Sequence, residues 1–123
     1  MKAVWTGRVL SAIPIIILLF SAALKFMRIP AVVDGFAQSG FSSGLILPIA
    51  IIELGCAIIY LIPRTAVLGA ILTTALFGGA TVTNLRVGDL SWIATVALGV
   101  LVWAGLFLRD SRLRALIPLR KLD

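Results

Sequence analysis

Glu53 is the residue whose type and setting in the sequence could do chemistry. It is the one charged residue in the apolar run 45–62. If that run crosses a membrane, Glu53 lies about eight residues from its start, which is roughly 12 Å at 1.5 Å per residue. A charge at that depth costs at least about 2.5 kcal/mol. We therefore expect the carboxyl group to face other helices and to be either protonated or paired.

Lys25 is the expected partner of Glu53. It follows the uncharged run 9–24, and its flexible stem can carry the ammonium group inward. Ser21 lies one helical turn before Lys25 on the same face. Small and polar residues recur every three or four positions in a later run, a pattern that lets membrane helices approach closely and hydrogen-bond. These residues are Ala66, Ala70, Thr74, Gly78, Thr81 and Asn84. We predict one polar patch made of Ser21, Lys25, Glu53, Thr81 and Asn84, with Arg86 at its mouth.

Two interpretations of this patch stay open. It could bind a small polar or quinone-like headgroup or relay protons, or it could be an ion pair and hydrogen bonds that only fix the packing. Cys56 and Tyr60 follow Glu53 on the same helical face. A lone cysteine in an apolar helix behaves as a small hydrophobic residue. We interpret Tyr60 as an aromatic anchor at the membrane interface.

The composition places these residues in a membrane protein. Of 123 residues, 61% are hydrophobic and 13% are charged, whereas about 25% are charged in typical globular proteins. The formal net charge is +6, but the basic residues lie between and after apolar runs, so the expected partners are the lipid bilayer and anionic headgroups rather than nucleic acid. With one cysteine and no histidine, neither an internal disulfide nor a transition-metal site is expected.

The apolar runs predict an all-α fold. A membrane-spanning helix needs about 20 residues, and we expect an up-down-up-down bundle of four transmembrane helices that forms one domain over residues 1–123. Their approximate ranges are 6–27, 44–62, 65–85 and 90–108. The long first connection predicts a short interfacial helix from Pro30 to Gln38 that buries Val33, Phe36 and Ala37.

The start of the chain allows an alternative. Lys2 and Arg8 precede an apolar run that ends near Ser21, as in a cleavable signal peptide. That interpretation would leave three spans, and we expect instead that the segment is retained.

Lysine and arginine counts predict the orientation. One side of the predicted bundle holds Lys2, Arg8, Arg64, Arg109, Arg112, Arg114, Arg120 and Lys121, and the other holds Lys25, Arg28 and Arg86. Both termini are therefore expected in the cytoplasm, in a multi-pass protein of the cytoplasmic (inner) membrane. Residues 109–123 form a basic cytoplasmic tail that is expected to lie against anionic lipids.

Several short stretches occur in a fixed order along residues 5–118. They are Ser21-Ala22-Ala23-Leu24-Lys25-Phe26, Glu53-Leu54-Gly55, Ile62-Pro63-Arg64-Thr65, Leu68-Gly69-Ala70, Gly78-Gly79-Ala80, Leu85-Arg86, Trp103, Leu108-Arg109-Asp110 and Ile117-Pro118. Taken in this order, they resemble the DoxX-like family of small four-helix membrane proteins.

This resemblance implies four helices in the cytoplasmic membrane, with the recurrent lysine and glutamate of the family at Lys25 and Glu53. Some relatives are linked to quinone-coupled sulfur oxidation or to thiol and oxidative-stress systems. Many similar sequences carry histidine where this one has Asn84, so a group that titrates near neutral pH is missing there.

The sequence and the resemblance together favour an accessory or assembly component of a membrane redox system, with a membrane-bound or soluble redox partner, that is not an enzyme on its own. One alternative is an oxidoreductase subunit with quinone as its cofactor. Another is a homo-oligomer that transports a small solute.

Overall fold

The structure, a computed structural model, describes residues 2–120 and 122. Lys121, which belongs to the predicted basic tail, lies outside the described residues, as do Met1 and Asp123. The elements in chain order are α1 (Lys2–Phe26), α2 (Pro30–Gln38), η1 (Ser43–Leu45), α3 (Ile46–Leu61), η2 (Pro63–Thr65), α4 (Ala66–Arg86), α5 (Trp92–Arg109) and α6 (Ser111–Arg114).

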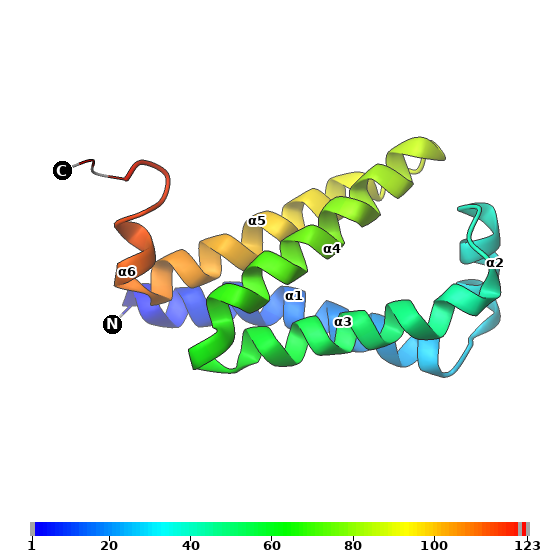
Figure 1. Cartoon of the computed structure of the whole chain (residues 1–123), viewed down its shortest axis with the longest axis horizontal. Helices are drawn as coiled ribbons and strands as arrows, with labels where there is room; N and C mark the ends of the chain where they lie inside the picture. Colours follow the sequence, from blue (N-terminus) through cyan, green and yellow to red (C-terminus); the bar gives the residue numbers. More distant parts are fainter. Residues whose placement is uncertain (1, 121, 123) are drawn as a thin grey trace.

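The predicted all-α class is confirmed. Over residues 2–120 and 122 the chain forms helices and no strand. Within that part, four helices are long and apolar enough to cross a membrane: α1, η1 with α3, η2 with α4, and α5. The chain runs along α1, returns along α3, runs out again along α4 and returns along α5 (Figure 1). Both described ends of the chain therefore lie at one end of the bundle, which we call the terminal end, and α2 lies at the other, the α2 end.

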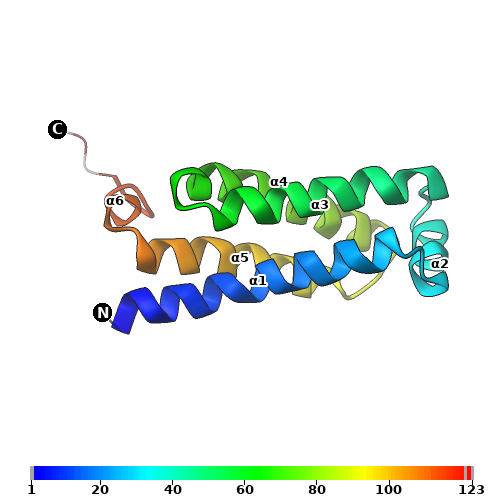
Figure 2. The same ribbon diagram turned by 90° about the horizontal axis from the view of Figure 1, so that it is seen from below.

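The spanning helices pack around the bundle in the order α1, α3, α4, α5, and α5 closes it against α1 (Figure 2). Close packing requires glycine at two of these contacts. A Cβ atom on Gly105 of α5 would lie 2.9 Å from the carbonyl oxygen of Gly7 in α1. A Cβ atom on Gly69 of α4 would lie 2.8 Å from the Cβ atom of Tyr60 in α3. Small residues allow membrane helices to approach to this extent.

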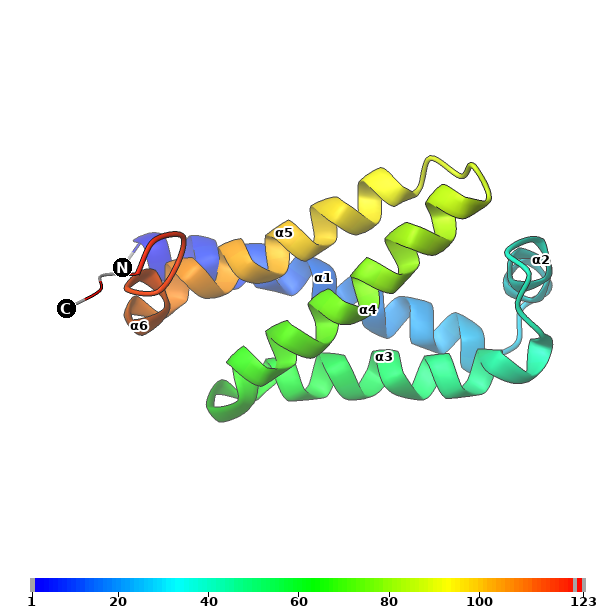
Figure 3. The same ribbon diagram turned by 45° about the horizontal axis from the view of Figure 1, so that its top comes forward.

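The bundle opens toward the α2 end. From the terminal end, α4 and α5 lean away from α1 and α3, so the two pairs of helices diverge like the arms of a V (Figures 1 and 3). The outward faces of the helices are apolar: Phe20, Ile51 and Val100 are each more than half exposed. Such surfaces suit contact with lipid rather than water.

A short helix, α2, spans Pro30–Gln38, where the sequence predicts it. Pro30 occupies its first turn, where the missing backbone N–H costs nothing. Val33 and Phe36 are half-buried as expected, but Ala37 is exposed. After α2 the chain turns through Gly40, whose φ of +84° favours glycine.

Two predictions about helix faces are wrong. Tyr60 is not an interface anchor: it is 2% exposed and lies in the core. The predicted stripe on α4 is wrong beyond Ala70, because Thr74 and Gly78 are exposed. Gly69, which the stripe omitted, packs against Tyr60, whereas Ala66 and Ala70 of the stripe are buried as predicted. The buried residues of α4 are Ala66, Gly69, Ala70, Thr73 and Phe77.

The basic tail is only partly helical. In the described part of the tail, α6 covers Ser111–Arg114 and begins at Asp110, whose side chain accepts a hydrogen bond from the backbone N–H of Arg112. Leu113 is buried against the bundle. Arg114 donates to the carbonyl oxygens of Phe107 and Leu108 at the end of α5, at 3.1 and 3.0 Å. The tail therefore caps α5 with a positive charge, which stabilises a helix C-terminus.

Candidate functional site

An ion pair between α1 and α3 is the centre of the site. Nζ of Lys25 lies 2.6 Å from Oε1 of Glu53 and donates a hydrogen bond of 2.5 Å to Oγ of Ser21. The side chains of Lys25 and Glu53 are 13% and 7% exposed. Ser21 and Lys25 are brought together by their four-residue spacing on one helix, whereas Glu53 meets them only because α1 and α3 pack side by side.

The pair has unused hydrogen-bonding capacity. Oε2 of Glu53 is buried and receives no hydrogen bond from the described residues. The ammonium group of Lys25 has three hydrogens, and Oε1 of Glu53 and Ser21 take two of them. The pair can therefore offer one acceptor and one donor to a third group. A buried acceptor that is left unsatisfied costs about 1–3 kcal/mol, so a ligand or water that donates to Oε2 is stabilised there.

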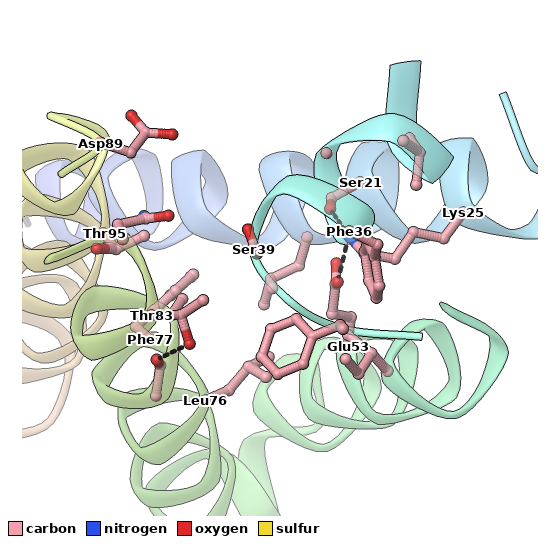
Figure 4. Close-up of a pocket in the computed structure, with 18 of the residues that line it drawn as sticks. Ser21, Lys25, Phe36, Ser39, Glu53, Leu76, Phe77, Thr83, Asp89 and Thr95 are labelled. Atoms are coloured by element: carbon pink, nitrogen blue, oxygen red, sulfur yellow. Dashed lines mark hydrogen bonds and ion pairs between the residues drawn. The ribbon is translucent and has the colours of Figure 1, made fainter. Parts of the chain in front are cut away.

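Lys25, Glu53 and Ser21 line a cavity of about 850 Å³ between the diverging helix pairs. Its walls are mainly apolar, with Leu18 of α1, Ile49 of α3 and Phe77 of α4 among them. Figure 4 shows Lys25, Ser21 and Glu53 together on one side, with Leu76, Phe77, Thr83 and Thr95 across from them. A mostly apolar cavity with a few convergent polar groups is typical of a site for a small molecule.

The α2 helix lies at the open end of the cavity. Phe36 and Val32 line the cavity from this helix, and the ring centroid of Phe36 is 6.0 Å from Nζ of Lys25. At the end of α4, Nη2 of Arg86 donates a hydrogen bond to the carbonyl oxygen of Ser39, just after α2. Arg86 therefore joins the two arms of the V at the α2 end of the bundle.

The predicted patch is only partly assembled. Ser21, Lys25 and Glu53 are in direct contact, and Asn84 lines the same cavity. Thr81 does not join them: its hydroxyl lies 2.7 Å from the hydroxyl of Thr95 and donates to the carbonyl oxygen of Phe77. Thr81 lines a separate groove between α4 and α5.

Sequence reasoning missed several residues at the cavity. Thr83, Thr95 and Asp89 line it, and no spacing relates them to Glu53. Phe36 could have been found, because it belongs to the apolar face of a helix that follows Lys25 closely.

The backbone N–H of Ser91 donates a 2.9 Å hydrogen bond to Oδ1 of Asp89, which holds the pKa of that carboxyl below its usual range. Asp89 therefore carries a negative charge near the α2 end of the bundle at neutral pH.

Together these features define a class: a small multi-pass helical membrane protein with a buried lysine–glutamate pair beside an apolar cavity. Comparison with family models matches residues 9–105 to the DoxX-like family. The chain belongs to the DoxX-like family, which confirms the resemblance. Neither the curated proteins nor the solved structures contain a match to this chain.

Proposed function

We propose that this protein is a small component of a membrane redox system that binds the headgroup of a quinone beside the Lys25–Glu53 pair. The observation that carries the proposal is the pair itself, which lines an apolar cavity and whose carboxylate keeps one oxygen without a hydrogen-bond partner in the described residues. A quinone carbonyl accepts a hydrogen bond and a quinol hydroxyl donates one, so the Lys25 ammonium suits the oxidised form and Oε2 of Glu53 suits the reduced form.

The walls of the cavity suit the rest of such a molecule. Quinone rings are planar and apolar, and Phe36 and Phe77 line the cavity with aromatic faces. The isoprenoid tail requires an apolar exit, and the outward faces of the helices are apolar. The protein would hold the headgroup while a partner supplies or removes electrons. In this arrangement the protein is an accessory subunit rather than an enzyme that acts alone.

Binding of decylubiquinone and of its reduced form, decylubiquinol, measured by calorimetry on the protein in lipid nanodiscs, tests the proposal. Glu53→Gln keeps the shape of the side chain but removes the charged acceptor. A hydrogen bond to a charged group contributes about 1.5–3 kcal/mol, so binding of the quinol form is expected to weaken by about tenfold or more. Asp34→Asn is the matched control, because Asp34 is an exposed carboxylate on α2. Wild-type protein that does not bind the quinone contradicts the proposal. A Glu53→Gln variant with unchanged affinity for the quinol contradicts it as well.

The accessory role has a separate test. The protein, purified in mild detergent from its own membrane, is expected to carry a redox protein with it at fixed stoichiometry. If it elutes without a redox protein, the quinone would be bound by a protein that works alone, and the accessory role would be wrong.

A further inference from the structure

A line of buried polar side chains leads from Glu53 toward the terminal end of the bundle. Its members lie on three helices and are each at most 6% exposed. They are Glu53, Cys56 and Tyr60 of α3, Thr73 of α4 and Ser11 of α1, and we call them the polar file. Residues 53, 56 and 60 share one helical face, and Tyr60 lies about 10 Å along the axis from Glu53 at 1.5 Å per residue.

Thr73 occupies the middle of the polar file. Gly69 of α4 packs against Tyr60, and α3 and α4 are antiparallel (Figure 1). Thr73 lies four residues after Gly69, and Cys56 lies four residues before Tyr60. Because the two helices run in opposite directions, Thr73 lies level with Cys56. The hydroxyl of Thr73 lies beside the Cys56 thiol, but within the described residues it makes no hydrogen bond of good geometry.

Two members of the file are buried and have no hydrogen-bond partner in the described residues: Oε2 of Glu53 and Oγ1 of Thr73. Leaving such a group unpaired destabilises the fold, and buried water is the usual partner of such groups. A water molecule between the carboxylate and the hydroxyl would satisfy both. It would also connect them into one hydrogen-bonded chain.

The file continues through Tyr60 to the terminal end. The phenolic oxygen of Tyr60 lies 2.8 Å from Oγ of Ser11 and donates to the carbonyl oxygen of Val102 at 2.7 Å. The guanidinium carbon of Arg109 lies 5.5 Å from the centroid of the Tyr60 ring. Because Arg109 is the last residue of α5, this part of the file is next to the terminal end of the bundle.

We propose that the polar file, completed by internal water, carries protons between the terminal end of the bundle and Glu53, from which the cavity leads to the α2 end. At each step one O–H bond breaks as another forms on the next oxygen, and the last bond forms at Oε2 of Glu53. The net change is conversion of a carboxylate into a carboxylic acid, which releases the ion pair with Lys25, and no electron moves. The proposal depends on the proposed function only for the use of the proton, which a bound quinone would take up on reduction.

The ionisable groups that face the file come from the surrounding helices. They are Lys25 of α1, Glu53, Cys56 and Tyr60 of α3, and Arg109 of α5. The two cations flank the file, one at each end. Both cations repel an excess proton, and the ionised carboxylate of Glu53 attracts it. Glu53 is therefore the group on which the proton is most stable.

Proton flux into vesicles tests the proposal. The protein is reconstituted with a pH-sensitive dye trapped inside, and a potassium gradient with valinomycin supplies the driving force. Wild-type protein is expected to pass protons faster than protein-free vesicles, and Glu53→Gln is expected to return the flux to that background. Thr73→Val removes one hydroxyl at nearly constant shape and should lower the flux by about tenfold, which corresponds to a barrier about 1.4 kcal/mol higher.

Two further variants separate conduction from folding. Thr73→Ser restores the hydroxyl and should restore the flux. Thr74→Val is the matched control, because Thr74 is the adjacent residue on α4, is exposed, and accepts a hydrogen bond from Trp103 outside the file. It should behave as wild type. Wild-type flux equal to that of protein-free vesicles, or a Thr73→Val flux equal to wild type, overturns the proposal.

The same preparations distinguish this inference from the proposed function. Thr73→Val should bind decylubiquinone as tightly as wild type, because Thr73 lies behind the cavity. If binding is intact and the flux is absent, the polar file does not conduct and the quinone site stands. If the flux follows the file and the quinone does not bind, the proposed function is wrong and the proton path stands.

Discussion

Nζ of Lys25 and Oε1 of Glu53 lie 2.6 Å apart, and they join α1 to α3 across the cavity from Phe77 of α4 (Figure 4). Without this pairing, α1 and α3 would each present an isolated charge to an apolar environment. Both charges are buried. Removing one of them therefore leaves the other without a partner to offset its desolvation cost. The pair therefore both closes the α1–α3 contact and places two polar groups at the cavity wall.

A double-mutant cycle on this pair should show strong coupling. Lys25→Met leaves an unpaired buried carboxylate, and breaking a buried pair in this way costs about 3–5 kcal/mol. Lys25→Met combined with Glu53→Leu removes both charges and is expected to cost less than the single substitution. Thermal unfolding in mild detergent measures the difference. Arg112→Met is the control, since the Arg112 side chain is 92% exposed in its pair with Asp110. A double variant less stable than Lys25→Met would contradict this account.

Glycine substitutions should separate close helix contacts from open ones. Gly69→Ala forces a Cβ atom against the backbone of Tyr60, and overpacking of this kind typically costs about 1–3 kcal/mol. Gly55→Ala is the matched control, because a Cβ atom there meets nothing within 4 Å. Alanine in a helix interior is more stable than glycine by about 0.5–1 kcal/mol, so Gly55→Ala should raise the melting temperature. Equal effects of the two variants would show that the α3–α4 contact is looser than described.

Arg86→Gln should speed exchange of a ligand in the cavity. The substitution weakens the hydrogen bond to the carbonyl oxygen of Ser39 that joins α4 to the segment after α2. A typical net contribution of about 0.5–1 kcal/mol predicts dissociation of decylubiquinone about threefold faster, measured by stopped-flow competition. Arg64→Gln, at the terminal end of the bundle, should leave the rate unchanged. An unaltered rate in Arg86→Gln would mean that α2 and α4 do not control access.

Cysteine labelling should reveal the orientation, which we expect to place both termini in the cytoplasm. In a Cys56→Ala background, Ser42→Cys at the α2 end and Ser111→Cys at the terminal end introduce exposed thiols. An impermeant maleimide added to intact cells should label Ser42→Cys and should reach Ser111→Cys only after permeabilisation. The reverse pattern would place the cavity on the cytoplasmic side.

Much of the architecture could be predicted because the bilayer imposes it locally. An apolar run of about 20 residues must form a helix to satisfy its backbone hydrogen bonds in lipid. The contact of Lys25 with Glu53 followed from the cost of a charge at that depth. Pro30 and the apolar face after it similarly indicated α2. The family was recognised from the order of short motifs, each of which is weak alone.

The sequence by itself thus determined the helices and the surplus of surface that faces lipid, because each depends on residues close together in the chain. It also indicated Lys25 as the partner of the deep carboxylate, because a charge at that depth requires one. Only the tertiary structure decided which face of α4 is buried, that Tyr60 lies in the core and that Thr81 turns away from Glu53. The physical reason is that a close contact such as Gly69 against Tyr60 sets the rotation of a whole helix, and a shift of one residue turns it by about 100°. Hydropathy is similar on all sides of these helices, so it does not indicate which face of a helix is buried.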